Sequence, residues 1–239
     1  MNETESKIIS IVKQECSCQA GEILVRLNTL QKPVTRTALH WYLNKLTREN
    51  RLARVARGIY SISQKKPFLP GISPRMREIS ALLNAELPFS DFCLYEGSEL
   101  SAYQHNIAPN DILYVETQRD SCESAFNILK REGISAFIRP TEDTIYHYAD
   151  LSENFVFIKN LTTESPVQTI DGIIVPKLEK ILVDIRIDKD FYYLHGTEAF
   201  YFLSNAVEQN SVNRSTLLRY ARRRNIEAQV KKDLEELRL

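Results

Sequence analysis

The stretch TRTALHWYLNKLTRENRLARVARGIYSI, residues 35–62, decides the fold of the first part of this chain. Its first half carries apolar residues at helical spacing, namely Ala38, Leu39, Tyr42, Leu43 and Leu46. Its second half has two short apolar-rich segments around Ala56-Arg57-Gly58, where the glycine can take the positive φ of a tight hairpin. We therefore expect a helix over about 36–50 and a β-hairpin over 51–62.

Two further helices are expected before this stretch. Ile8, Ile9, Ile11 and Val12 recur at helical spacing, which predicts a helix over about 3–15, and Gly21 opens a second, shorter one. Pro33 disfavours helix at the residue before it, and Thr35 can cap the helix that follows. Three helices and a hairpin in this order predict a winged helix-turn-helix domain over residues 1–66.

The charge of this region differs from that of the whole chain. The formal net charge is zero, yet residues 26–66 hold ten Lys or Arg against the single acid Glu49. Residues 84–124 hold eight acids and only Arg119 to oppose them. Because an acidic surface repels a phosphate backbone, we expect nucleic-acid binding in the first domain.

The basic surface predicts a set of DNA contacts. A DNA-reading helix presents its amino-terminal residues to base edges, which places Arg36, Thr37 and His40 at bases. Lys45 and Arg48 fall later on the helix, toward phosphates, and Arg54 and Arg57 lie on the strand and tip of the hairpin. The full predicted set is Thr35, Arg36, Thr37, His40, Asn44, Lys45, Arg48, Arg54 and Arg57. A solvated amphipathic helix and a winged helix that contacts protein are the alternatives.

Residues 67–74, which are rich in proline, are predicted to be a linker. From residue 75 to 239, helix and strand patterns alternate and then give way to helices, which predicts a larger α/β domain with a mixed sheet and a helical carboxyl terminus. The whole chain is thus predicted to combine an α+β domain over residues 1–66 with an α/β domain over residues 75–239. The last helices are interpreted as a solvated helix pair that packs on the α/β domain. The alternatives are that Arg219, Arg222 and Arg223 bind an acidic partner or make a second phosphate contact.

The second domain raises the question of an enzyme. A strand, a Gly97-Ser98 turn and an acidic strand follow one another, which is the layout of a nucleotidyltransferase. An active enzyme of that class holds Mg²⁺ with two carboxylates that lie two residues apart on the acidic strand. Asp111-Ile112-Leu113 lacks the second one, and Glu116 has an odd offset that directs it to the opposite face. A nuclease site with Glu116 and Gln118 would lack its lysine. We predict a degenerate layout, with no catalytic residue and no enzymatic activity.

Other polar residues are expected to be structural. Lys177, Glu179 and Lys180 follow Pro176 on a helix and are interpreted as its solvated face. The four cysteines and four histidines have no metal-ligand spacing, so neither a metal site nor a cofactor is predicted. No segment approaches the roughly 18 apolar residues of a membrane span, so a cytoplasmic protein without membrane contact is expected.

Four short stretches resemble the AbiEi-type antitoxins of bacterial abortive-infection toxin-antitoxin systems. They are Thr35-Arg36-Thr37-Ala38-Leu39, Ala56-Arg57-Gly58-Ile59-Tyr60, Val175-Pro176-Lys177-Leu178-Glu179-Lys180-Ile181-Leu182-Val183-Asp184 and Tyr220-Ala221-Arg222-Arg223. The resemblance implies a winged-helix repressor that binds inverted repeats in the promoter of its own operon. It also implies a second domain that neutralises a nucleotidyltransferase-like toxin, with or without direct contact.

Two other functions remain open from the sequence. One is a ligand-responsive winged-helix regulator, in which the second domain senses a small molecule and no toxin exists. The other is a metal-dependent nucleotidyltransferase or nuclease centred on Asp111 and Glu116.

Overall fold

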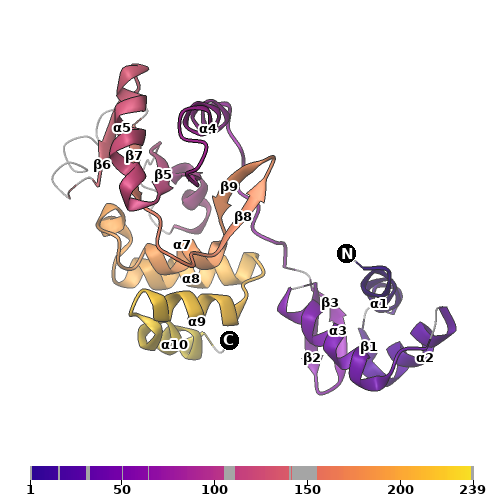
Figure 1. Cartoon of the computed structure of the whole chain (residues 1–239). Helices are drawn as coiled ribbons and strands as arrows, with labels where there is room; N and C mark the ends of the chain where they lie inside the picture. The colour runs from indigo at the N-terminus through magenta and orange to yellow at the C-terminus, as the bar shows by residue number, and fades with distance from the viewer. Residues whose placement is uncertain are drawn as a thin grey trace. The chain divides into compact units, whose positions relative to one another are not determined.

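The computed structural model describes residues 2–15, 17–30, 33–49, 51–63, 65–104, 111–139, 141 and 155–237. The chain divides into two compact units, each with its own core. The first unit comprises Met1–Pro67 with Glu208–Asn213, and the second comprises Phe68–Val207 with Arg214–Leu239. Figure 1 labels most of the helices and strands of both units.

Among its described residues, the first unit has three helices, α1 to α3, and one small antiparallel sheet. In chain order its elements are α1 Glu3–Gln14, β1 Ser17–Gln19, α2 Ala20–Leu30, α3 Arg36–Arg48, β2 Leu52–Ala56 and β3 Ile59–Ile62, and the sheet order is β1-β3-β2. The expected helices and hairpin are present. Strand β1 was not predicted, because three residues are too short to show the alternation of a strand.

Local signals in the sequence explain the boundaries of α3 and of the hairpin. The Thr35 hydroxyl accepts a hydrogen bond from the Ala38 amide at 3.2 Å, so α3 begins at the expected cap. Gly58 has φ +75°, the backbone region that glycine occupies without steric cost, and it turns the chain between β2 and β3. The apolar face of α3 packs into the core through Leu39, Leu43 and Leu46.

The second unit is built on a six-stranded sheet of order β6-β7-β5-β4-β9-β8. The strands are β4 Cys93–Glu96, β5 Leu113–Thr117, β6 Ala136–Ile138, β7 Val156–Asn160, β8 Val167–Ile170 and β9 Ile173–Pro176. The β5/β7, β6/β7 and β4/β9 pairs are parallel, whereas β4/β5 and β8/β9 are antiparallel. The expected mixed sheet of an α and β protein is therefore confirmed.

Helical segments surround this sheet (Figure 1). They are α4 Pro74–Glu86, α5 Cys122–Arg131, α7 Leu178–Asp184, α8 Thr197–Gln209, α9 Arg214–Arg223, α10 Glu227–Glu236 and the 3₁₀ segments η1 Gly97–Tyr103, η2 Arg119–Ser121 and η3 Lys189–Leu194. The segment η1 directly follows β4. β8 was not predicted; it joins β9 through a turn at Asp171 and Gly172, both of which have positive φ.

The two faces of the sheet bury different chemistry. One face presents apolar side chains of β4, β5 and β7, such as Leu94, Val115 and Ile158, to α4 and α5. Because side chains alternate along a strand, the intervening residues Tyr114 and Glu116 of β5 lie on the other face. There Tyr114 contacts Phe191 of η3 with ring centroids 5.3 Å apart. The second face is therefore aromatic and charged, and it carries the polar network described below.

The expected linker is partly packed against the second unit. Phe68 is buried and its ring lies 6.3 Å from that of Tyr103, while its carbonyl accepts a hydrogen bond from the Gln168 side chain at 3.1 Å. Residues 67–73 form neither helix nor strand, and Ser73 caps α4 at its start. Within the described ranges, no helix is both long enough and apolar enough to cross a membrane.

Candidate functional site

A hollow of about 650 Å³ in the first unit is lined by most of the residues that are predicted to contact DNA. Arg36, His40 and Asn44 are exposed on α3 at intervals of four residues, so they share one face of the helix. Arg54 of β2 and Arg57 of the turn are also exposed and line the same hollow. The remaining walls come from residues 19–21 and 58–60. The surface is concave, with a helix on one side and a hairpin on the other.

The hollow has an excess of positive charge. Its lining includes three arginines and no acidic residue. None of these arginines forms an ion pair with a carboxylate in the described part of the chain, whereas Arg26 of α2 pairs with Glu15 at 2.8 Å and Glu22 at 3.2 Å. The guanidinium groups of the hollow are therefore free to pair with an external anion.

Lys45 lies outside the lining of the hollow and pairs within the chain. Its ammonium lies 2.6 Å from the Glu5 carboxylate of α1 and 5.6 Å from the centre of the Trp41 ring. Glu5 is only 3% exposed, so Lys45 supplies the charge that this carboxylate requires. Thr35 serves as the cap of α3, while Thr37 and Arg48 are exposed outside the lining of the hollow.

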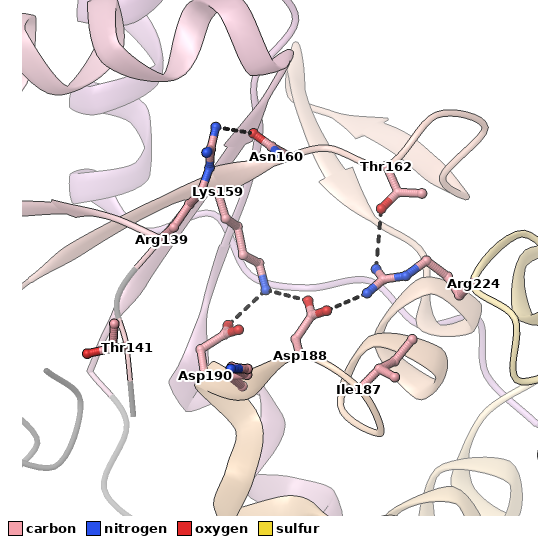
Figure 2. A pocket seen from close by; sticks show the side chains of 10 residues that line it. Arg139, Thr141, Lys159, Asn160, Thr162, Ile187, Asp188, Asp190 and Arg224 are labelled. Atoms are coloured by element: carbon pink, nitrogen blue, oxygen red, sulfur yellow. Dashed lines mark hydrogen bonds and ion pairs between the residues drawn. The ribbon is translucent and has the colours of Figure 1, made fainter. Parts of the chain in front are cut away.

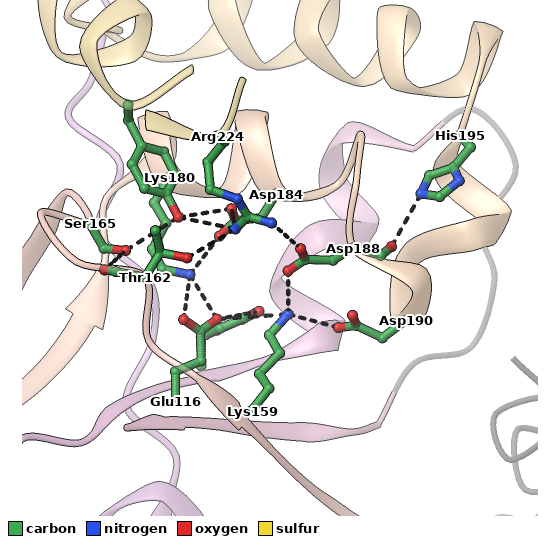
Figure 3. A network of polar contacts seen from close by, with 12 residues as sticks. Glu116, Lys159, Thr162, Ser165, Lys180, Asp184, Asp188, Asp190, His195 and Arg224 are labelled. Carbon is green, nitrogen blue, oxygen red and sulfur yellow. Dashed lines mark hydrogen bonds and ion pairs between the residues drawn. The ribbon is translucent and has the colours of Figure 1, made fainter. Parts of the chain in front are cut away.

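A buried charge network lies on the polar face of the sheet in the second unit (Figure 3). The Lys180 ammonium of α7 donates to the Glu116 carboxylate of β5 at 2.7 Å and to Asp184, one turn further along α7, at 2.6 Å. All three side chains are 2% exposed. The Tyr220 hydroxyl of α9 donates to Asp184 at 2.9 Å. The network thus joins the sheet, α7 and α9.

A second part of the network surrounds Lys159 of β7. Its ammonium donates to Asp188 at 2.9 Å and to Asp190 at 2.8 Å, and it lies 4.7 Å from the centre of the Phe191 ring. Arg224, just beyond α9, bridges the two parts because its guanidinium donates to both Asp184 and Asp188. Each buried carboxylate of the network therefore faces at least one cation.

These contacts keep Lys180 and Asp188 charged despite burial. Burial lowers the pKa of Lys180, but the carboxylates of Asp184 and Glu116 outweigh it and hold that pKa above its ordinary value. Burial raises the pKa of Asp188, but Lys159 and Arg224 outweigh it and bring the pKa from 3.8 to about 2. Both ions are thus stabilised at neutral pH.

The sequence interpretation of α7 was wrong. Glu179 and Lys180 were expected on a solvated face, yet they are 6% and 1% exposed, and only Lys177 of that set is exposed. The helix is buried on all sides because the sheet and α9 both pack against it. Lys180 and Asp184 at a spacing of four residues, inside an otherwise apolar run, were the signal for an internal ion pair.

The candidate catalytic carboxylates do not converge. Asp111 is exposed before β5, whereas Glu116 is buried near its end and bonded to Lys180. Five residues of extended chain separate them by on the order of 15 Å. Across the described ranges, no three His, Cys, Asp or Glu side chains form a group that could hold a metal ion.

The candidate partner-binding arginines have different surroundings. Arg222 forms two hydrogen bonds to Glu227, at 2.7 and 2.9 Å, and Arg223 donates to the Thr163 hydroxyl. Arg219 is exposed. Arg224, which the sequence did not single out, is the arginine that enters the buried network. Of the three predicted residues, Arg222 and Arg223 thus already have partners within the chain.

The substitution Lys180→Met should destabilise the second unit by about 3–5 kcal/mol, because it leaves the buried Glu116 and Asp184 carboxylates without their shared ammonium. Urea unfolding followed by far-ultraviolet circular dichroism measures this loss. Lys177→Met is the matched control, since Lys177 is exposed three residues away, and its effect should stay within about 0.5 kcal/mol. Equal effects of the two substitutions would contradict the role of the network.

The pKa of Asp188 predicts a loss of stability in acid. Its folded-state pKa of about 2 lies below the ordinary 3.8, so its contribution is present above pH 4 and is lost as the pH falls toward 2. That contribution is about 2 kcal/mol at most. The free energy of unfolding of Asp188→Asn should therefore fall less steeply than that of the unmodified chain between pH 4 and 2. Identical slopes would refute the assignment.

Comparison with known proteins gives one family. The search of curated proteins found no match. The model of DUF6577, a family of unknown function, matches residues 38–238, which include most of α3, the β2–β3 hairpin and nearly all of the second unit. The chain therefore belongs to the DUF6577 family.

Proposed function

We propose that this protein is a DNA-binding antitoxin that represses its own toxin-antitoxin operon and neutralises a nucleotidyltransferase-like toxin. The observation that carries the DNA-binding part is the hollow between α3 and the β2–β3 hairpin, lined by Arg36, Arg54 and Arg57 and by no acid. A groove that combines a helix face with uncompensated arginines suits both base edges and phosphates of DNA.

The order of the elements supports a winged helix-turn-helix. Three helices with β1 between the first two, followed by a hairpin whose β3 strand pairs with β1, is the layout that this fold requires. In this assignment α3 enters the major groove and the hairpin is the wing. His40 and Asn44 then face base edges one and two turns beyond Arg36.

The antitoxin part rests on the resemblance to AbiEi-type proteins. Two of the resembling stretches, 175–184 and 220–223, meet in the buried network, where Tyr220 donates to Asp184. Residues that resemble the family therefore hold the second unit together. The β4 strand, the Gly97–Ser98 start of η1 and the antiparallel β5 agree with a degenerate nucleotidyltransferase-like layout. In this proposal promoter DNA with inverted repeats and the toxin are the partners.

DNA binding should depend strongly on salt and on individual arginines. With about five phosphate contacts, log affinity against log salt should have a slope of roughly −5. Arg57→Ala should weaken binding to all DNA sequences by a similar factor, because it removes one phosphate contact. The salt slope should become less steep by about 1. Arg36→Ala should cost about 1–3 kcal/mol on the target site and relax its sequence preference. Fluorescence anisotropy with labelled promoter and scrambled duplexes measures these effects.

Lys13→Ala is the matched control for this experiment. Lys13 is exposed in the last turn of α1, in the same unit but outside the lining of the hollow. Its removal lowers the net charge equally and should change affinity by less than about threefold. Affinity that is independent of salt, or equal losses in all three variants, would overturn the interface.

Neutralisation should be separable from DNA binding. Co-expression of the full chain with a neighbouring nucleotidyltransferase-like gene should restore growth, and a chain carrying Arg36→Ala and Arg57→Ala should restore it equally, because the second unit is assigned this role. Continued growth arrest beside the folded full chain would reject the antitoxin assignment and leave DNA binding standing. Growth and promoter-reporter output are measured in the same cells.

A further inference from the structure

A polar cavity of about 720 Å³ opens at the carboxyl ends of β6 and β7 in the second unit (Figure 2). Arg139 directly follows β6, and Asn160 is the last residue of β7. The segment after α7 and the residue after α9 complete the wall, and the full lining is Arg139, Thr141, Lys159, Asn160, Thr162, Ile187, Asp188, Lys189, Asp190 and Arg224. The carboxyl ends of parallel strands are the usual place for ligands in α/β sheets.

The charge of the lining favours an anion. Four cations and two carboxylates line the cavity, so two positive charges are in excess. The two carboxylates, Asp188 and Asp190, are already bonded to Lys159, and Asp188 also accepts from Arg224. Both carboxylates are therefore already paired with cations of the chain itself.

Arg139 and Lys189 supply the excess charge. Both are exposed, and neither forms an ion pair with a carboxylate of the described residues. Arg139 donates to the neutral Asn160 side chain at 3.1 Å, which orients its guanidinium without neutralising it. Its φ of 46° is the left-handed conformation, which is uncommon for an arginine and is often found at ligand sites.

The buried part of the wall is fixed in advance. Lys159 is 12% exposed and Arg224 is 19% exposed, and both are held by carboxylates. Thr162 accepts a hydrogen bond from Arg224 at 3.3 Å, so its hydroxyl proton can be donated into the cavity. A wall with the Thr162 hydroxyl as a donor and two cations without carboxylate partners is suited to an oxyanion with several acceptor oxygens.

We propose that this cavity binds the phosphate monoester group of a small molecule, with Arg139 and Lys189 as its charged contacts. A phosphate monoester carries a charge of about −1.5 to −2 at pH 7, close to the excess in the lining. The volume lies in the range of small-ligand sites, about 300–1,000 Å³. The site belongs to the second unit alone and does not depend on DNA binding by the first.

Isothermal titration calorimetry of the full chain tests this site with inorganic phosphate, ribose 5-phosphate and ribose. Both phosphates should bind, and ribose should bind at least tenfold more weakly than ribose 5-phosphate. Arg139→Gln and Lys189→Gln should each weaken phosphate binding by about tenfold, the effect of losing one charged contact. Arg219→Gln, which removes a charge from an exposed position of α9 outside the lining, is the matched control and should leave affinity within twofold.

A second readout avoids substitutions at the site. In the unmodified chain, ribose 5-phosphate should protect Lys189 from acetylation, measured by peptide mass spectrometry, while exposed Lys177 keeps its reactivity. Equal binding of ribose and ribose 5-phosphate would overturn the proposal. Undiminished phosphate affinity in both variants, or unchanged reactivity of Lys189, would also overturn it.

Discussion

The second unit depends on the hydrogen-bonded ion pairs that the buried Lys180 ammonium forms with two carboxylates. A charge removed from water requires carboxylates at hydrogen-bond distance, and here they come from Glu116 of β5 and Asp184 of α7. Asp184 in turn accepts from Tyr220 and Arg224. Segments more than 100 residues apart in the sequence, from 116 to 224, must therefore meet in one arrangement.

The same types of residue have different roles in the two units. In the second unit, cations neutralise buried acids and hold helices against the sheet. In the first unit, Lys45 does this for Glu5, while Arg36, Arg54 and Arg57 stay exposed around a hollow without acids. Net charge does not reveal this division, because the chain is formally neutral. The position of each cation relative to the core decides whether it stabilises the fold or is available to an external anion.

Much of the local structure could be predicted from the sequence. Apolar spacing and the Thr35 cap located α3, and Gly58 located the hairpin turn, because these signals are local. The short strands β1 and β8 were missed because pairing with a distant strand, rather than their own pattern, defines them. The buried pair of Lys180 and Glu116 was also missed, since 64 residues separate its members. Of the predicted DNA contacts, Arg36, His40, Asn44, Arg54 and Arg57 line one hollow. Lys45 instead pairs with Glu5, a residue that the basic pattern did not include.

Hydroxyl-radical footprinting of the full chain on the DNA upstream of its own reading frame tests the DNA-binding claim most directly. A helix in the major groove with a wing beside it should protect a short interval on each strand, and inverted repeats should give two such intervals related by symmetry. The account predicts paired protected intervals at a defined site. Uniform cleavage along the fragment, at protein concentrations that saturate non-specific binding, would contradict it.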